Sequence, residues 1–534
     1  MYPVGRAYKR LIYIVLVWTC VSFVAFRVTT RGGSSFFSPW DDYFSSSSGN
    51  NNNNLLVNSN QRGLLQQSAP EYSSASLDSI LASSSSQQLL KQLLDEKNSN
   101  VISDKISVSV DYSPALSEQD LLLSLSNASN NLALSSWSRV WKNAKSKSAS
   151  ACRPEFPSLF ELDYNNVYWQ RFQASVGNNG TFYLFAAYYD DRWRGGPLPM
   201  VRILAMIDRV TPPEVFCQLW FDEFTAPIMA PATYVYGWYP KWGNYADGHL
   251  QPFIVTCKVP RIKGIPRTSV PTSVSLVSNK CDKITNNLKV VNNRPPVKKR
   301  FAVCVKGLDF LYEDMSVRLV EWLELLKILG ASKVFLYDLE VHPNISKVID
   351  HYSQEGLVEV TKISLPGNQP NLPGFRHLYL KKKLTDKRQN ELIPYNDCLY
   401  RNLYSFEYLA LLDIDEIIMP LRHDNWSDMM DEVLKVSLLE KNFTRASYNF
   451  RNVYFLDDIG SASSETSDTS MSSSSPSNHG EHTGHEPGIP SFLHMLQHVY
   501  RSRNYTKPGQ YVKCFHNTER VVSITFHFIY LFCS

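Results

Sequence analysis

The stretch Tyr408-Leu-Ala-Leu-Leu-Asp-Ile-Asp-Glu (residues 408–416) runs from five apolar residues directly into three acids. A short apolar run predicts a buried strand, and in an open α/β sheet ligands bind where the strands end. Asp413 and Asp415 face the same way if the chain is extended, because side chains alternate along a strand. Two such carboxylates form a hard-oxygen site suited to Mn²⁺ or Mg²⁺. The competing interpretation is a solvated acidic turn, since an isolated D-x-D pattern often occurs by chance.

The residues around this stretch alternate between strand-like and helix-like patterns. A helix is expected from Asp314 to about Leu329, capped by Asp314 and ended by Gly330. This alternation predicts an α/β domain with a mostly parallel sheet and crossover helices over residues 296–534. The other expected elements are strands at 301–305, 334–337 and 358–360, and helices at 346–352 and about 399–408.

A different composition precedes this domain, in residues 151–295. Short aromatic and β-branched runs, punctuated by Gly, Pro and Asn, predict a mostly β module there. Cys217 and Cys257 are candidates for a disulfide within it. The aromatic stretch 237–242 is expected to serve ordinary packing, with stacking on a sugar as the alternative. The segment 286–300 is expected to be a linker.

Two segments of low complexity lie outside these patterns. Residues 28–150 contain homopolymer runs of Ser and Asn and bury too little apolar surface to offset chain entropy. We expect a disordered, flexible stem or, alternatively, a tail without a function of its own. Residues 460–487 are expected to form a surface insertion loop within the second domain. Its histidines are expected to be solvated, with weak metal binding as the alternative: His479, His482 and His485.

The N-terminus carries a membrane signal. Residues 1–10 contain three basic residues, and an apolar run within 11–27 follows them. This predicts a cytoplasmic tail (1–10) and a signal-anchor transmembrane helix (11–27), because bulky residues stand where a cleavage site would need small ones. A cleaved signal peptide is the alternative. The basic flank predicts a single-pass type II protein with its bulk in the lumen, and the short span suits thin membranes of the early secretory pathway.

Composition and sequons limit the partners and the compartment. The net charge of +4 over 534 residues gives no reason to expect nucleic acid as a partner. The nine cysteines contain no CxxC pair, which argues against a zinc site, and eight of them follow the anchor, where disulfides can form. Six N-glycosylation sequons also follow it: Asn127, Asn179, Asn344, Asn425, Asn442 and Asn504.

Four motifs occur in order along residues 301–528: Cys304-Val-Lys-Gly, Glu321-Trp-Leu-Glu with Gly330-Ala-Ser-Lys-Val-Phe-Leu-Tyr, Asn396-Asp-Cys-Leu-Tyr-Arg, and Leu412-Asp-Ile-Asp-Glu with Pro420. In these motifs the chain resembles glycosyltransferase family 92, a GT-A-type group that includes β-1,4-galactosyltransferases. The resemblance implies a GT-A-type nucleotide-sugar-binding domain, UDP-galactose as donor, Mn²⁺ as cofactor and inversion at the anomeric carbon. The expected function is transfer of galactose to glycans of glycoproteins in the Golgi.

The resemblance also implies roles for individual residues. Asp415 is expected to bind the metal. Asp413 is expected to contact the ribose of the donor or to share the metal. Asp397 and Arg401, on the helix before the acidic strand, are expected to help hold the donor. The alternative for this last pair is a structural polar network.

Three other groups are less sharply defined by the sequence. A histidine late in the domain is expected to complete the metal site, with His527 first and His516 second, or to be a buried core histidine. The basic run at 381–388 can attract a diphosphate or an acidic glycan, or can form a solvated helix face. Inverting transfer needs a general base, and spacing does not choose one among the later carboxylates: Glu440, Asp457, Asp458 and Glu519.

Two other functions fit parts of the sequence. The chain ends soon after Phe528, whereas family members continue further, which would leave a catalytically impaired Golgi glycan-binding or scaffold protein. A metal-dependent phosphohydrolase would use the same acids but would need more carboxylates or histidines beside them. Dependence on a sugar acceptor separates transfer from hydrolysis.

Overall fold

The computed structural model describes residues 155–157, 159–175, 179–192, 198–224, 226–261, 269–455, 489–490, 492–498, 501–509 and 511–524, and the backbone of 529–531. Within these residues no helix is long and apolar enough to cross a bilayer. The expected tail, anchor, stem and insertion loop lie outside the described residues. Asn127 and His527 lie outside them as well, so these predictions stay predictions.

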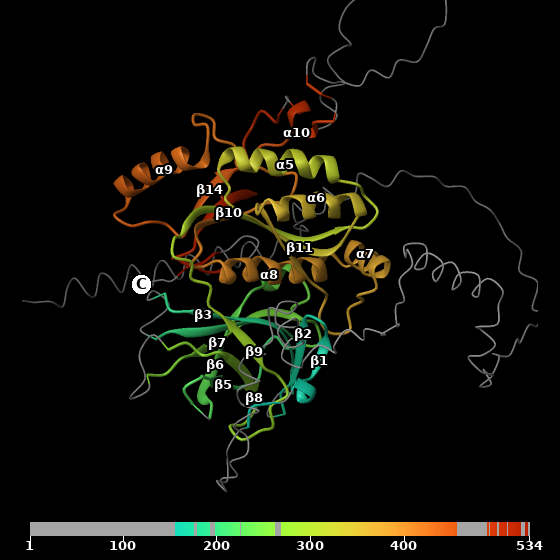
Figure 1. The fold of residues 1–534 in the computed structure, drawn as a ribbon, viewed down its shortest axis with the longest axis vertical. Helices are drawn as coiled ribbons and strands as arrows, with labels where there is room; N and C mark the ends of the chain where they lie inside the picture. The colour runs from blue at the N-terminus through green and yellow to red at the C-terminus, as the bar shows by residue number, and fades with distance from the viewer. Residues whose placement is uncertain are drawn as a thin grey trace, which may run out of the picture. The chain divides into compact units, whose positions relative to one another are not determined.

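The first folded part is a β-barrel, which confirms the predicted β module (Figure 1). Its strands are joined in the order β1-β2-β3-β4-β7-β6-β5-β8-β9, and a parallel pairing of β9 with β3 closes the barrel. The other pairings are antiparallel. The strands are β1 (Tyr164–Asn166), β2 (Trp169–Gln173), β3 (Thr181–Asp190), β4 (Met200–Ile207), β5 (Phe216–Trp220), β6 (Ile228–Tyr236), β7 (Gln251–Lys258), β8 (Ser273–Val277) and β9 (Leu288–Val291), with 3-10 turns η2 (Leu159–Glu161) and η4 (Pro240–Trp242).

Three local predictions for the barrel can be compared with the structure. Cys217 and Cys257 form a disulfide, as expected. Trp238 is buried and its ring packs edge-on against Trp242, so the aromatic stretch contributes to packing. The linker predicted at 286–300 is wrong in its first half, because β9 belongs to the barrel and the Asn286 side chain bonds the backbone of Leu276.

The second part is built on a six-stranded sheet in the order β12-β11-β10-β13-β15-β14. The first four strands are parallel, whereas β15 runs antiparallel to both of its neighbours, so the sheet is mixed but largely parallel. A hairpin of β16 with β17 follows. The strands are β10 (Lys299–Phe310), β11 (Val334–Val341), β12 (Val358–Lys362), β13 (Phe406–Leu411), β14 (Ser447–Arg451), β15 (Val512–Asn517), β16 (Val521–Ile524) and β17 (Ile529–Leu531).

Helices cover both faces of this sheet (Figure 1). Helices α5 and α6 pack with α9 on one face, and α8 lies between the other face and the barrel. The helices are α5 (Ser316–Leu329), α6 (Pro343–Gln354), α7 (Pro373–Lys382), α8 (Leu384–Arg401), α9 (Trp426–Glu440) and α10 (His494–Gln497).

The helix predictions were right for α5 and wrong for α8. Gly330 ends α5 in the left-handed region, at φ 96°, as expected. The predicted cap differs, because the N-cap is Met315 and Asp314 stands one residue before it, where its carboxylate accepts a hydrogen bond from the backbone N–H of Ser316. The helix predicted at 399–408 in fact ends at Arg401, and β13 begins at Phe406. The sequence did not reveal where α8 begins, because this helix contains Pro394 and buries polar as well as apolar residues. Both features obscure the helical pattern.

The barrel and the sheet share one hydrophobic core. Strand β3 is buried on both faces, because Phe182 and Leu184 point into the barrel while Phe185 and Tyr188 point toward α8. The same cluster contains Leu399 of α8. The two folded parts therefore form a continuous structure around this helix.

Candidate active site

The acidic residues follow the carboxyl end of β13, where the parallel part of the sheet ends. The backbone N–H of Leu412 still bonds the carbonyl of Cys304 on β10, and the chain then turns at Ile414 and Asp415. The N–H of Glu416 bonds the carbonyl of Asp413 at 3.0 Å, which closes the turn. The chain is therefore not extended from 413 to 415 as considered from the sequence, because this turn interrupts the strand and Ile414 packs in the core. Asp413 is consequently half-buried and Asp415 is exposed.

Two lysines flank the acids, and the sequence reasoning assigned neither to the site. Lys306 Nζ lies 3.1 Å from Asp413 Oδ2 and 3.7 Å from Glu391 Oε1. Lys513 Nζ lies 2.5 Å from Glu416 Oε2, which also accepts the backbone N–H of Asp413. Lys306 stands in the motif Cys304-Val-Lys-Gly, within β10 and two residues past the last pairing of that strand with β13. Its place in this motif was the feature of the sequence that could have identified Lys306 as a site residue.

The charge on Lys306 is maintained by its neighbours. Burial disfavours the ammonium, but the carboxylates of Glu391 and Asp413 outweigh burial and raise the pKa of Lys306 above its usual value. Burial raises the pKa of Glu391 and, despite Lys513, that of Glu416. The end of β13 therefore holds a positive charge beside carboxyl groups that are kept partly out of water.

Asp413 has an unsatisfied oxygen. Its Oδ1 is buried and has no hydrogen-bond partner among the described residues, whereas Oδ2 is bonded to Lys306. Buried carboxylate oxygens are normally bonded, so this atom calls for a ligand. Together with exposed Asp415 it supplies the hard oxygen donors that Mn²⁺ or Mg²⁺ takes. No group of three or more His, Cys, Asp and Glu suited to a metal occurs in the described parts of the chain.

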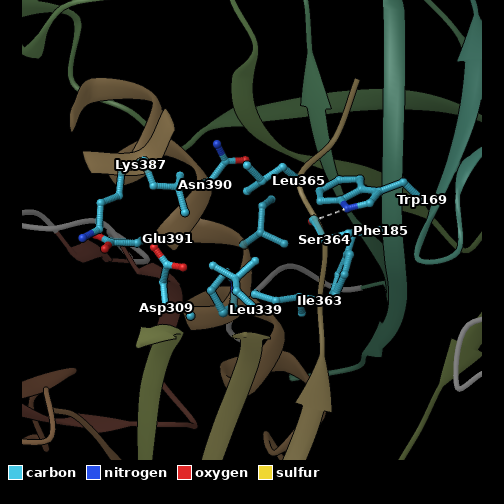
Figure 2. A pocket seen from close by; sticks show the side chains of 14 residues that line it. Trp169, Phe185, Asp309, Leu339, Ile363, Ser364, Leu365, Lys387, Asn390 and Glu391 are labelled. Carbon is cyan, nitrogen blue, oxygen red and sulfur yellow. Dashed lines mark hydrogen bonds between the residues drawn. The ribbon is translucent and has the colours of Figure 1, made fainter. Parts of the chain in front are cut away.

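A pocket opens at the same edge of the sheet, with about 470 Å³ of empty space when the open solvent at its mouth is included. Its walls come from the ends of β10 and β11, from the segment after β12, from α8 and from the barrel. Figure 2 shows Asp309 and Glu391 on one side and Trp169 and Phe185 on the other. Lys387, part of the basic run, also lines it. Lys306 joins this pocket to the acidic turn, because it contacts both Glu391 and Asp413.

The two acids of the pocket have buried carboxyl groups that can accept hydrogen bonds from a ligand. Asp309 Oδ2 lies 3.1 Å from His377 Nδ1, and the Asp309 side chain is only 10% exposed. Its Oδ1 is buried and finds no partner in the part of the chain that the structure describes. Glu391 is buried beside it in α8. A ligand that has N–H or O–H groups and an apolar part matches this lining.

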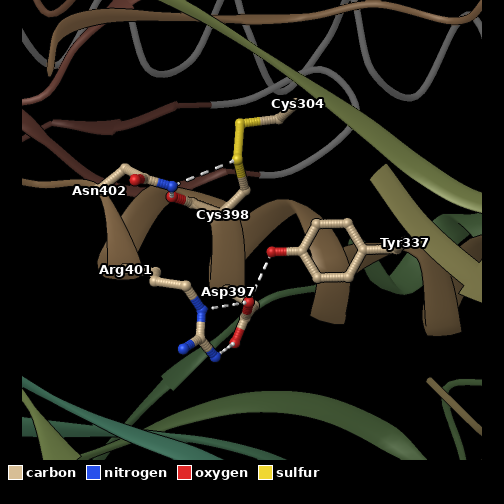
Figure 3. Close-up of a disulfide and its surroundings, with 6 residues drawn as sticks. All are labelled: Cys304, Tyr337, Asp397, Cys398, Arg401 and Asn402. Carbon is tan, nitrogen blue, oxygen red and sulfur yellow. Dashed lines mark hydrogen bonds and ion pairs between the residues drawn. A yellow bond between two sulfur atoms is a disulfide. The ribbon is translucent and has the colours of Figure 1, made fainter. Parts of the chain in front are cut away.

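Asp397 and Arg401 lie elsewhere, in the interior between α8, β11 and the barrel (Figure 3). Asp397 is fully buried and accepts hydrogen bonds from Tyr188, Tyr337 and Arg401, so both of its oxygens are occupied. Burial opposes the charge on Arg401, but Asp397 raises the pKa of Arg401 well above its usual value. The structural interpretation accounts for every one of these bonds. A contact with the donor stays a prediction.

Two further features surround the site. A disulfide between Cys304 and Cys398 ties β10 to α8 (Figure 3). His516 is buried in β15 opposite Leu409, and burial lowers its pKa to about 4. The structure does not bring His516 into a metal-binding group with the acids, and it has the properties of a neutral core histidine.

Five of the predicted glycosylation sites can be placed. Asn425 is partly buried and caps α9, where its Oδ1 accepts the N–H of Asp428 at 2.9 Å. A glycan at Asn425 would have to be attached to the side chain that caps this helix. The exposed sites are Asn179, Asn344, Asn442 and Asn504.

Comparison with known proteins identifies the domain that carries this site. Residues 299–533 match the model of glycosyltransferase family 92, and the domain that they form belongs to this family. The match begins at the first residue of β10, so the barrel lies outside it. No curated protein matches the chain. Membership implies sugar transfer, and with it a sugar donor and an acceptor.

Proposed function

We propose that this glycosyltransferase is an inverting, metal-dependent enzyme of the GT-A type that transfers galactose from UDP-galactose to glycans of glycoproteins. The observation that carries the proposal is the buried, unpartnered Oδ1 of Asp413 at the carboxyl end of a parallel strand, beside Lys306. This is the edge at which ligands bind in open α/β sheets. The family match supports sugar transfer, and the finer choice of donor and metal is our inference.

Different residues at this edge bind different parts of the nucleotide-sugar. The pocket with Asp309 and Glu391 takes the nucleoside, whose N–H and O–H groups meet the two carboxyl groups. Lys306, between the pocket and the acidic turn, contacts the diphosphate. Asp413 and Asp415 would hold Mn²⁺ or Mg²⁺, which when bound neutralises charge on the leaving diphosphate.

The general base is left unassigned. Two of the candidate carboxylates are engaged at the surface, because Glu440 pairs with Arg445 and Glu519 with Lys298. Asp457 and Asp458 lie outside the described residues. The base therefore has to be found by mutation in the presence of an acceptor.

We further propose a Golgi location as a single-pass type II membrane protein, with the catalytic domain in the lumen. The apolar run within 11–27 supports an anchor. Two disulfides, Cys217–Cys257 and Cys304–Cys398, and four exposed sequons are typical of the secretory pathway.

The test is release of UDP by the full-length chain in detergent, from a panel of UDP-sugars. It is run with Mn²⁺ or EDTA, with and without a mixed glycan acceptor, for the wild type, Asp415→Ala and the control Asp350→Ala, an exposed acid on α6. We expect turnover of UDP-galactose that needs both metal and acceptor and is lost only in Asp415→Ala. Metal-dependent hydrolysis that ignores every acceptor would favour a phosphohydrolase. Silence with all donors would favour the non-catalytic, glycan-binding alternative.

A further inference from the structure

The segment after β12 forms one wall of the pocket but is held mainly from outside the catalytic domain. Its first residue, Ile363, still bonds the carbonyl of Asp338 at 3.0 Å. From Ser364 onward the chain leaves the sheet and passes along the barrel. Ile363, Ser364 and Leu365 all line the pocket. The position of this wall therefore depends on what the segment contacts after it leaves the sheet.

The contacts come from β1 and β2 of the barrel. Trp169 Nε1 donates to the carbonyl of Ser364 at 2.8 Å (Figure 2). Asn166 Nδ2 donates to the carbonyl of Leu365 at 3.0 Å, and its Oδ1 accepts the hydroxyl of Ser364 at 2.7 Å. Three adjacent polar groups of the wall are thus bonded to two barrel side chains. Within the catalytic domain, the Asn371 side chain also bonds the backbone of Leu365.

The same arrangement continues at Gly367. Asn165 accepts the N–H of Gly367 at 2.8 Å and donates to its carbonyl at 3.2 Å. Gly367 has φ 66°, and a Cβ there would come within 3.2–3.4 Å of Leu250 and Tyr183 of the barrel. Glycine adopts this backbone conformation without strain, and a larger residue would also have to displace these two side chains slightly. The sequence is therefore fitted to the barrel at this point.

The barrel also supplies part of the wall directly. Trp169 and Phe185 line the pocket with their ring centroids 5.1 Å apart, and both side chains are almost fully buried. Their burial leaves little ring surface for a ligand. The contribution of Trp169 is thus to fix the place of Ser364 and its neighbours, which makes it a positioning residue.

We infer that the barrel is a working part of the donor site, in which Asn165, Asn166 and Trp169 position the wall 363–367 for the nucleoside end of the donor. This rests on the proposed function of the pocket. Each bond removed should loosen the wall and weaken donor binding while leaving the acidic turn intact. One hydrogen bond corresponds to roughly a three- to tenfold change in an equilibrium constant.

The test compares Trp169→Phe, which keeps a ring but removes the donor N–H, with Tyr234→Phe. Tyr234 donates to the carbonyl of Pro213 within the barrel, so its variant also loses one hydrogen bond but leaves the wall untouched. Asn165→Ala, at a less buried position, is a second test variant. For each full-length variant we would measure the Kd for UDP with Mn²⁺, the donor KM, kcat, Tm and amide exchange over 363–371.

We expect Trp169→Phe and Asn165→Ala to raise the Kd and the KM about three- to tenfold, with kcat within about twofold and faster exchange over 363–371. Tyr234→Phe should match the wild type in all but Tm. Unchanged Kd, KM and exchange in both test variants, with UDP bound normally by the wild type, would overturn this inference and leave the proposed function standing. Absence of nucleotide binding in the wild type would instead overturn the proposed function.

Discussion

Asp413 and Asp397 are both aspartates beside a basic side chain in the same domain, yet their surroundings differ. Asp397 is fully buried, and two tyrosines and Arg401 occupy both of its oxygens. Asp413 is bonded to Lys306 through one oxygen only, and its other oxygen is buried without a partner among the described residues. A complete network of this kind maintains a fold, whereas an incomplete one at a sheet edge is ready for a ligand. On our proposal, this difference separates a structural pair from a functional one.

The largest expected effect is on catalysis at the incomplete site. Asp413→Asn and Asp415→Ala should each lower kcat/KM by about a thousandfold or more, because bound metal contributes several kcal/mol to transition-state stabilisation. The melting temperature should change little, since Asp415 is exposed and Asp413 is only half-buried. Steady-state kinetics and thermal unfolding of the same preparations check both parts. Near-normal turnover by either variant would contradict the proposal that Asp413 and Asp415 act in catalysis.

Breaking the complete network should act on stability instead. Asp397→Ala leaves Arg401 charged and buried without its partner, which should lower the free energy of unfolding by about 3–5 kcal/mol. Denaturant unfolding measures this effect, with the exposed pair at Lys327 and Glu355 as a control through Glu355→Ala. If Asp397→Ala were as stable as wild type but failed to bind UDP, the donor-holding role predicted from the sequence would be correct.

Lys306 allows a finer comparison, because it contacts Asp413 on one side and Glu391 on the other. Lys306→Met should weaken binding of UDP about ten- to a hundredfold through loss of charge-assisted bonds to phosphate. Binding of uridine, which lacks phosphate, should be unchanged. Lys381→Met, on an exposed part of α7, is the matched control. Equal losses for UDP and uridine would mean that Lys306 shapes the pocket rather than contacting the diphosphate.

The smallest effect concerns pH and the buried His516. Its folded pKa of about 4 lies below the ordinary value of about 6.5, so the unfolded chain takes up a proton first as pH falls. Stability is therefore fully present above about pH 6.5 and declines toward pH 4, by about 2 kcal/mol between pH 7 and pH 5. His516→Gln should lack this part of the pH dependence. Parallel unfolding curves for both proteins at pH 7 and pH 5 measure the difference.

Much of the scaffold followed from local pattern. The strands around Phe301, Val334 and Val358 and the end of α5 at Gly330 were predicted, because buried strands and a glycine stop are local signals. The extent of α8 was not, since its buried side is polar where it meets the barrel and Lys306. Closure of the barrel by β3 and β9 joins strands about a hundred residues apart in sequence, which no local pattern reveals.

The sequence chose the place of the candidate site but not most of the residues that surround it. Asp413 and Asp415 were found because an apolar strand runs into them. Lys306, Glu391 and Asp309 were missed as partners, since they come from a neighbouring strand and a helix that only the fold brings to the pocket. Asp397 was predicted near the donor from a motif, and its tyrosine partners on β3 and β11 could not be read from that motif.

The most direct measurement is calorimetric titration of UDP, in Mn²⁺ and in EDTA, into the wild type, Asp413→Asn and Asp350→Ala. The account predicts Mn²⁺-dependent binding by the wild type and by Asp350→Ala. Asp413→Asn should lose that dependence while remaining folded by circular dichroism. Mn²⁺-dependent binding of the same strength in Asp413→Asn would contradict the claim that the unpartnered carboxylate at the end of β13 holds the metal of the donor site.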